Sequence, residues 1–295
     1  MTTTSTTMRK IVITGGCGQL GRAIMEVAQG SKNSYIALSS DEADICDAEA
    51  MERLISAHNA EVIINCAAYT NVERAESDAE SAERVNNHGV ATLAEVCNRH
   101  SVKLIHISTD YVFGGDEERT TPYTTDDRPA PINNYGRSKA HGEIAALRAE
   151  GGVVIRTSWL YAPWGKNFCR TILRIADEQE QISVVDDQRG TPTSALSLAR
   201  AIVGLIDSNT IEHLAGIYHY TDGGEATWYD FAKEIVRLAG ARCSVNPCTS
   251  QERATIAARP RYSVLDKSRI IAAGATIRPW QETLKECITQ IMIER

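Results

Sequence analysis

The chain of 295 residues carries 38 acidic and 31 basic side chains, for a formal net charge of −7, and 43% of its residues are hydrophobic. This composition is ordinary for a globular protein, and the length allows one large α/β domain or a nucleotide-binding domain with a smaller companion. Apolar runs all fall short of the roughly 18 residues of a transmembrane helix, so no membrane span is predicted. Lys and Arg form no block, which disfavours nucleic-acid binding because phosphate neutralisation needs clustered basic residues.

The N-terminus and the cysteines bear on the cellular compartment. Residues 1–7 are Met followed only by Thr and Ser. They lack the apolar core of a secretory signal, so a disordered leader and cytoplasmic residence are predicted. The eight cysteines are scattered without a CxxC pair and are interpreted as buried, reduced thiols. Neither they nor the seven histidines show metal-ligand spacing, so no metal site is predicted.

Over the first 160 residues, short apolar and β-branched runs alternate with longer helical patterns. Helices are predicted at 19–29, 48–58 and 79–99. The runs between them predict strands at 10–14, 35–38, 61–66, 102–107 and 152–156. Continuous apolar strands separated by helices are typical of a parallel sheet covered on both faces. The predicted fold class is α/β, a Rossmann-type doubly wound parallel sheet.

The pattern becomes less regular beyond residue 160. It predicts helices at 167–178, 194–206 and 228–239, and strands at 182–185 and 216–220. Neither an internal repeat nor a Pro/Gly-rich linker separates the two halves. We therefore expect an NAD(P)-binding Rossmann domain over 8–160 and a smaller C-terminal substrate-binding lobe over 161–295, with the chain crossing between the two.

A glycine-rich loop joins the first predicted strand to its helix. Gly15, Gly18 and Gly21 have the spacing GxxGxxG, and Gln19 and Leu20 lie between the last two. Glycine is needed where the turn is tight and where backbone approaches a pyrophosphate, while the helix N-terminus offers N–H groups and partial positive charge. A glycine triplet alone is a weak signal, but its position between strand and helix predicts dinucleotide binding by this loop.

The end of the second strand bears on the choice of cofactor. A carboxylate there would hold a ribose 2′-hydroxyl, but the strand ends in Ser39 and Ser40, and the first carboxylate is Asp41. This pattern favours NADPH, with Arg22 as a phosphate partner, whereas NADH is expected if Asp41 reaches back to the ribose. Further contacts to the adenine, ribose and phosphates are predicted for Ser39, Asp44, Ile45, Ala67, Ala68, Tyr69 and Thr70.

Tyr135 and Lys139 lie four residues apart, hence on one face of a predicted helix. A phenol with a pKa near 10 is a poor acid at neutral pH, and a neighbouring ammonium lowers that pKa toward the working range. The lysine could also bond the nicotinamide ribose, so both residues are candidates for catalysis and cofactor binding. By itself, such a pair is usually a solvated surface pair.

Ser108, Thr109 and Asp110 follow the fourth predicted strand, where side chains point into the crevice at the carboxyl edge of the sheet. A hydroxyl there can bond a substrate carbonyl and stabilise developing alkoxide charge. The order of glycine loop, Ser-Thr segment and YxxxK motif resembles that of the short-chain dehydrogenase/reductase superfamily. This resemblance implies a nicotinamide-dependent oxidoreductase.

The similarity extends to one family of extended short-chain enzymes, the dTDP-4-dehydrorhamnose reductases. The similar segments occur in order over almost the whole chain. They are Gly18–Gly21, Asn65–Glu73, Ser108–Phe113, Asn133–Lys139, Arg156–Tyr161, Gly165–Phe168, Asp187–Thr193 and Arg259–Leu265.

This resemblance implies reduction of the C4 ketone of dTDP-4-dehydro-L-rhamnose to dTDP-L-rhamnose, with hydride from NADPH or also NADH. Carried over by position, it makes Thr109, Tyr135 and Lys139 the catalytic set. Substrate contacts are implied for Ser108, Thr109, Asp110, Trp159, Asn167, Phe168 and Arg259. Two of these have plain alternatives, because Trp159 could be a core side chain and Arg259 a surface arginine.

The chain departs from some family members that bind Mg²⁺ between subunits through glutamates. Ala23 stands two residues after the last glycine of the loop, and Ser194–Ser197 contain no carboxylate. The expectation is therefore no metal, and a monomer or weak homodimer. Open alternatives are a reductase of another nucleotide-linked 4-keto-6-deoxyhexose and a non-catalytic NADP-binding regulatory subunit, as in the accessory subunit of methionine adenosyltransferase. The sequence leaves open the sugar, the nucleotide base, the C4 stereochemistry and the preference between NADPH and NADH.

Overall fold

The computed structural model describes residues 8–293, so the expected leader at 1–7 lies outside it. Six parallel strands form a central sheet in the order β10-β5-β4-β3-β1-β2. The strands are β1 (Lys10–Thr14), β2 (Ser34–Leu38), β3 (Val62–Asn65), β4 (Lys103–Thr109), β5 (Val153–Thr157) and β10 (Gly216–His219). The predicted doubly wound α/β fold is confirmed, and β10 extends the five strands expected from the first half of the chain.

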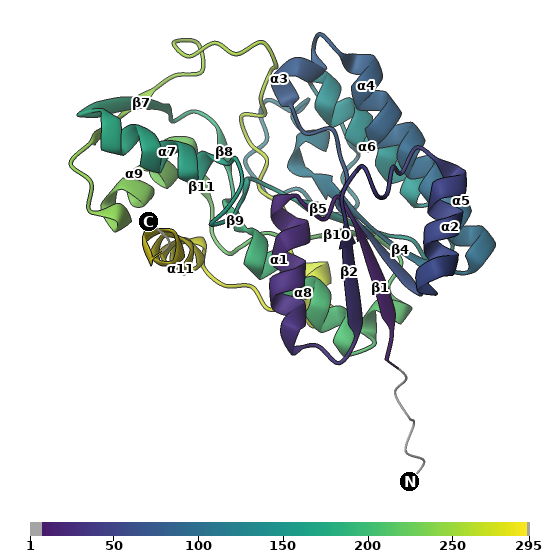
Figure 1. The fold of residues 1–295 in the computed structure, drawn as a ribbon. Helices are drawn as coiled ribbons and strands as arrows, with labels where there is room; N and C mark the ends of the chain where they lie inside the picture. Colours follow the sequence, from purple (N-terminus) through teal and green to yellow (C-terminus); the bar gives the residue numbers. More distant parts are fainter. Residues whose placement is uncertain (1–7, 294–295) are drawn as a thin grey trace.

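Consecutive residues of β1 enter two different cores because side chains of a strand alternate between its faces. Ile11 and Ile13 pack with α1 and α8, whereas Val12 packs with α2 and α5. Helices thus cover both faces of the sheet (Figure 1). The helices are α1 (Gln19–Val27) and α8 (Ala195–Asp207) on one face, and α2 (Ala48–His58), α5 (Val90–His100) and α6 (Asn134–Ala146) on the other.

The long helix predicted over 79–99 is divided by a wide π-helical turn, Arg84–Gly89, between α4 (Ala79–Glu83) and α5. The turn aims Asn86 at two neighbours. Its amide accepts from the backbone N–H of Tyr69 at 2.8 Å and donates to the Ser138 hydroxyl at 2.9 Å. A π-helical turn of this kind often occurs at functional sites, and here it connects the 66–70 segment to α6.

A smaller lobe has its own core of aromatic and aliphatic side chains, including Tyr161, Phe231, Trp280 and Leu284. Its main elements are α7 (Phe168–Glu178), β7 (Gln181–Val185), α9 (Trp228–Ala239), β12 (Ser244–Cys248) and α11 (Trp280–Ile293), with β7 and β12 paired in parallel. The α11 helix was not among the predicted elements. Short pairs complete the lobe: β6 (Leu160–Tyr161) with β9 (Thr193–Ser194), and β8 (Arg189–Gly190) with β11 (Ala226–Thr227).

The chain passes between the sheet and the smaller lobe more than once. After α7 and β7 it returns to the sheet through α8 and β10, and then re-enters the lobe at α9. Residues 249–267, called the connecting segment below, then run from β12 toward α3 (Val72–Ala75) and back to α10 (Ser268–Ala272), as Figure 1 shows in yellow-green. The domain boundary at residue 160 stays a prediction, although α8 and β10 lie beyond it in sequence.

Two further features concern the whole described chain. Among residues 8–293, no helix is long and apolar enough to cross a membrane. All eight cysteines are unpaired, and four of them, Cys97, Cys169, Cys243 and Cys287, are buried.

Candidate active site

The glycine loop follows β1 at the point where the sheet order reverses, with β2 on one side of β1 and β3 on the other. Ligands of doubly wound sheets bind at such a switch point. Gly15 has φ +67°, and a Cβ there would lie 2.6 Å from the Ala67 nitrogen. A Cβ on Gly21 would lie 2.6 Å from the Gly16 Cα. Gly15 therefore allows the loop to fold closely against the segment after β3, and Gly21 allows α1 to pack closely against the loop.

The α1 helix has no side-chain cap at Gly18, whereas Asp47, Asn133 and Asn167 cap α2, α6 and α7. No N-cap side chain therefore occupies its first backbone N–H groups, as an anionic ligand requires. Leu20 turns its side chain into the core. Gln19 bonds the lobe instead: its carbonyl accepts from the Trp164 indole at 3.1 Å and its side chain accepts from Asn167 at 2.9 Å.

The tip of β2 carries a carboxylate that the sequence argument overlooked. Ser39 donates from its backbone N–H and its hydroxyl to Glu42, at 2.9 and 2.7 Å. These hydrogen bonds hold the pKa of Glu42 below its usual value. The preference for NADPH was argued from the absence of a carboxylate at the end of β2, and this absence is wrong because Glu42 lies there. Asp44 is exposed nearby, while Ile45 is 2% exposed and belongs to the core.

The segment Ala67–Thr70 forms the wall of the crevice beyond β3. Ala67 donates its backbone N–H to Asn65 at 3.1 Å, and Tyr69 is held by Asn86 through both its N–H and its carbonyl. The side chains from Ala67 to Tyr69 are half-buried and Thr70 is exposed. The segment is thus fixed by buried amides while part of its surface stays accessible.

Consecutive residues at the end of β4 face different surroundings. Ser108 donates to Glu143 at 2.6 Å, within a buried ion pair in which Arg156 approaches the same carboxylate at 2.7 Å. Thr109 lies on the other side, where it donates to Asp110 at 3.2 Å. Asp110 also accepts from Ser263 of the connecting segment at 2.6 Å, and burial raises the pKa of its carboxyl to about 7. Of the three, Thr109 lies beside Tyr135.

Tyr135 projects from the first turn of α6, which Asn133 caps by accepting from the Gly136 N–H at 2.7 Å. Its ring meets Tyr111 edge-on with centroids 5.7 Å apart. Burial raises the pKa of the phenol, while the adjacent Thr109 hydroxyl acts in the opposite direction. The expected lowering of the Tyr135 pKa is therefore wrong for this structure, because desolvation of the phenol is the largest effect and raises the pKa.

Lys139 is 2% exposed and points toward β4. Its ammonium nitrogen donates to the Ile107 carbonyl at 2.7 Å and lies 3.3 Å from His106 Nε2. Burial lowers the pKa of Lys139 to about 8, with Glu143 and Cys66 acting in the opposite direction. The pair is not a solvated surface pair, because Lys139 is buried and Tyr135 is half-buried.

Trp159 is neither a core side chain nor fully exposed. It has φ +45°, and its half-buried ring stacks on Trp228 with centroids 3.6 Å apart and 9° between the planes. Gly190 lies against the same ring, since a Cβ there would come within 2.6 Å of it. Phe168 contacts Trp228 at 4.6 Å between ring centroids. The result is a rigid aromatic platform of Trp159, Trp228 and Phe168.

Arg259 is partnered by protein groups. Its guanidinium donates to Glu73 at 2.8 Å, and it also interacts with the Tyr111 phenol. Glu73 further accepts from the backbone N–H groups of Ile256 and Ala257. These contacts hold the connecting segment against α3. The residues involved are far apart in sequence, so no local sequence pattern predicts their pairing.

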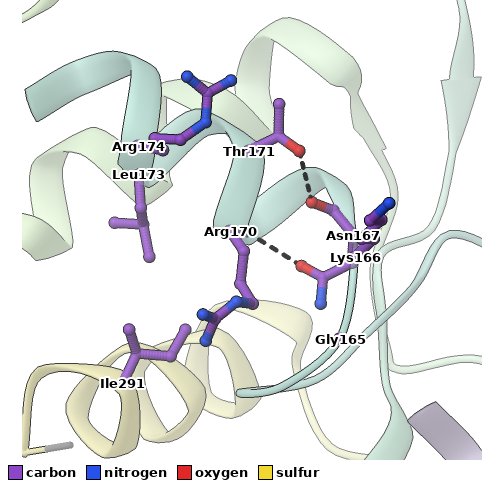
Figure 2. Close-up of a pocket in the computed structure, with 8 residues that line it drawn as sticks. All are labelled: Gly165, Lys166, Asn167, Arg170, Thr171, Leu173, Arg174 and Ile291. Carbon is purple, nitrogen blue, oxygen red and sulfur yellow. Dashed lines mark hydrogen bonds between the residues drawn. The ribbon is translucent and has the colours of Figure 1, made fainter. Parts of the chain in front are cut away.

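A basic cavity opens beside the first turns of α7 (Figure 2). It has a volume of about 510 Å³, and its charged lining residues are Lys166, Arg170 and Arg174. Asn167 forms its edge as the cap of α7, accepting from the Arg170 N–H at 3.0 Å. Tyr135 and Lys139 do not line this cavity, so it is distinct from the catalytic pair. Among residues 8–293, no group of three or more His, Cys, Asp or Glu side chains is arranged to hold a metal ion.

A glycine loop at the switch point of a parallel sheet, with Thr109, Tyr135 and Lys139 around the end of β4, defines a dinucleotide-binding protein of the extended short-chain dehydrogenase/reductase type. Residues 8–293 match the family described as RmlD substrate binding domain, and the chain belongs to this family. The resemblance noted in the sequence is thereby confirmed.

Individual relatives agree over nearly full length. The chain is 39% identical to a dTDP-4-keto-6-deoxy-D-glucose reductase of Streptomyces niveus, over 93% of this chain and 95% of the relative. It is also 39% identical to a dTDP-4-dehydrorhamnose reductase of Mycolicibacterium smegmatis, over 96% and 86%. The crystal structure of dTDP-4-dehydrorhamnose reductase from Bacillus anthracis in complex with NADP superposes with a TM-score of 0.90 at 35% identity, covering 96% of this chain and all of that one.

Proposed function

We propose that this protein catalyses the NADPH-dependent reduction of the C4 ketone of dTDP-4-dehydro-L-rhamnose to dTDP-L-rhamnose. The observation that carries the proposal is that Tyr135 contacts Thr109 and Lys139 donates to Ile107, both at the end of β4, in a chain similar throughout to a reductase of that name. The cofactor of the Bacillus anthracis relative supports NADPH, with NADH as a second donor.

The residues at the switch point fit a dinucleotide. The first turn of α1 lacks a side-chain cap, and Gly15 and Gly21 leave no Cβ between the loop and its surroundings. Gly15, Gly18, Gln19, Leu20 and Gly21 would hold the pyrophosphate through backbone, and Ser39, Asp44, Ile45 and the segment Ala67–Thr70 would surround the rest. When bound, NADPH supplies the hydride.

The protein's own part is proton transfer and positioning. Tyr135 would give its phenolic proton to the oxygen at C4, so that hydride and proton together convert the ketone to a hydroxyl. Thr109 would donate a hydrogen bond to the same oxygen and stabilise its developing charge. Lys139 would hold the ribose through the N–H that Ile107 leaves free.

Substrate contacts follow from the same crevice. The platform of Trp159 and Trp228 offers a flat apolar surface for the sugar, and Asn167 and Phe168 stand at the start of α7 next to Gln19. Arg259 would hold the nucleotide diphosphate on exchanging part of its contact with Glu73. Asp110 and Ser108 would shape the floor, since their polar atoms already bond protein groups.

Turnover of purified dTDP-4-dehydro-L-rhamnose, followed as loss of NADPH absorbance, tests the proposal. The Tyr135→Phe variant removes the proton donor and should lower kcat at least about a hundredfold, the usual contribution of a general acid. Its fold and its affinity for NADPH, measured by thermal melting and fluorescence titration, should match the wild type. Wild-type turnover by Tyr135→Phe would overturn the role of Tyr135.

A second sugar deserves a parallel assay because the Streptomyces niveus relative, equally similar, is named for dTDP-4-keto-6-deoxy-D-glucose. Product analysis by NMR separates the two substrates and gives the C4 stereochemistry. No turnover of either sugar, together with a stoichiometric protein partner, would indicate the regulatory-subunit alternative instead. We further propose a cytoplasmic monomer or weak homodimer that needs no metal, with a Rossmann domain over 8–160 and a substrate-binding lobe over 161–295.

A further inference from the structure

A continuous line of buried polar side chains leads from β1 to the catalytic lysine. Thr14 donates its hydroxyl to Asn65 Oδ1 at 2.7 Å, Asn65 Nδ2 lies 3.0 Å from His106 Nδ1, and His106 Nε2 lies 3.3 Å from Lys139 Nζ. The first three residues are fully buried and Lys139 is 2% exposed. Each of β1, β3, β4 and α6 thus contributes one member.

The orientation of the Asn65 amide is fixed by backbone. The Ala67 N–H donates to Asn65 Oδ1 at 3.1 Å, and a backbone N–H has no lone pair that could accept from an amide nitrogen. The opposite end of the amide, directed at His106, is therefore the NH₂ group. Since this group can only donate, His106 Nδ1 must accept, and the single proton of the neutral imidazole lies on Nε2.

This tautomer has a consequence for Lys139. The Nε2–H group faces Nζ, and an ammonium has three N–H donors and no lone pair, so two donors would oppose each other. A neutral amine accepts this N–H and still donates to the Ile107 carbonyl at 2.7 Å. We propose that Asn65 locks His106 in the Nε2–H tautomer, and that His106 in this form is a positioning residue that holds Lys139 and favours its neutral amine.

The other charged and titratable groups around Lys139 do not reverse this preference. Glu143, one turn further along α6, is engaged by Arg156 at 2.8 and 2.7 Å and by Ser108 at 2.6 Å. Cys66, after β3, is a thiol whose pKa burial raises. Burial and the neighbouring lysine hold the pKa of His106 well below its usual value, which keeps the ring neutral.

The catalytic consequence rests on the proposed reductase function. A lysine with an ordinary pKa near 10.4 stays charged throughout the physiological range, whereas one shifted toward neutrality exchanges its proton there. The pH profile of kcat should contain a step set by Lys139, and that step should depend on Asn65.

Asn65→Asp is the informative variant because it exchanges the donor and acceptor roles between Asn65, His106 and Lys139 while the side chain keeps nearly the same shape. One carboxylate oxygen keeps the bonds from Thr14 and Ala67, and the other accepts from His106 Nδ1–H. The lone pair of Nε2 then faces Lys139 and accepts from the ammonium. We expect the pKa of Lys139 to rise by at least about one unit, a tenfold change in its protonation ratio. Asn71→Asp is the matched control, since it adds the same charge and Asp serves equally well as the cap of α3.

Two NMR measurements test the inference without an activity assay. A failed inference can therefore be distinguished from a failed proposal for the function. The ¹⁵N shifts of the His106 ring, assigned with His106→Gln, should show the Nε2–H tautomer in the wild type and in Asn71→Asp. The ¹⁵N shift of Lys139, assigned with Lys139→Met, should titrate near neutrality in both and higher in Asn65→Asp. A Nδ1–H tautomer, an imidazolium, or an unchanged titration of Lys139 in folded Asn65→Asp would overturn the inference. If Asn65→Asp does not fold, the wild-type tautomer and titration still decide it.

Discussion

Glu42 shows how one side chain can influence the choice between two cofactors. Its carboxylate occupies both donors of Ser39, the backbone N–H and the hydroxyl, at the strand end where a ribose 2′-substituent binds. A 2′-phosphate would need the same donors and would be repelled by the charge. A ribose 2′-hydroxyl, in contrast, could donate to this carboxylate.

We therefore expect Glu42→Ala to shift the enzyme toward NADPH. The variant frees both Ser39 donors and removes one negative charge, so the ratio of kcat/KM for NADPH over NADH should rise several-fold. Steady-state kinetics with each cofactor at saturating sugar measure this ratio.

Asp41→Ala provides the comparison, since it removes a neighbouring exposed carboxylate without a bond to Ser39. A general effect of charge would move both variants equally, whereas occupation of the Ser39 donors predicts a larger shift for Glu42→Ala. Equal ratios in Glu42→Ala and the wild type would show that Glu42 leaves the 2′-position when the cofactor binds.

At the scale of elements, glycines decide how closely α6 approaches its neighbours. A Cβ on Gly142 would lie 2.0 Å from the Asn86 carbonyl in the π-helical turn. Gly204, in the middle of α8, is exposed and has no atom within 4 Å of its Cβ position. Substitution by alanine therefore adds a methyl group in a crowded position at Gly142 and in an open position at Gly204.

Gly142→Ala should destabilise the protein by at least about 1–3 kcal/mol, because the extra methyl must push α6 away from the π-helical turn. Gly204→Ala should stabilise it by about 0.5–1 kcal/mol, because alanine is the better helix former and meets no obstacle. Denaturant unfolding of both variants measures the difference. A neutral Gly142→Ala would mean that the turn yields to the methyl group at no cost.

Elements with a clean periodicity could be predicted to within a residue or two, as the ranges of β1, α2 and α9 show. The π-helical turn could not, because its sequence continues the helical pattern and only packing against α6 and Tyr69 selects the wider turn. The helix α11 was missed although Leu284, Cys287, Ile288 and Ile291 have helical spacing and are all buried. There the signal was present in the sequence.

The proposed catalytic residues Thr109, Tyr135 and Lys139 could be selected from the sequence because they belong to local motifs. Their electrostatic state could not be predicted, since the pKa values of both Tyr135 and Lys139 depend first on burial, which a local motif does not show. The pairing of Glu73 with Arg259 spans two distant parts of the chain and has no local pattern. By contrast, the contact between Ser39 and Glu42 spans three residues and was within reach of sequence reasoning.

At the scale of the whole molecule, Asp222 connects the sheet to the lobe. One oxygen accepts from the Ser194 N–H at the start of α8, at 2.9 Å, and from the Thr283 hydroxyl on α11, at 2.7 Å. The side chain is fully buried, and burial raises the pKa of this carboxyl to about 6. At neutral pH the junction therefore contains a buried negative charge without a counter-ion bonded to it.

This arrangement predicts a specific pH dependence of stability. The pKa of Asp222 is higher in the folded than in the unfolded chain. Its stabilising contribution to the free energy of unfolding is therefore fully present below about pH 4 and is lost as pH rises through about 6. The shift of roughly two units corresponds to at most about 3 kcal/mol.

Asp222→Asn keeps an oxygen for Ser194 and Thr283 and does not ionise, so the free energy of unfolding of the variant, minus that of the wild type, should increase between pH 4 and 7. Burial lowers the pKa of His219 to about 3, which works in the opposite direction over an overlapping range, but it contributes equally to both proteins. The difference measured by urea unfolding at each pH therefore isolates Asp222, and a difference independent of pH would mean that the carboxyl has the same pKa in the folded and the unfolded chain.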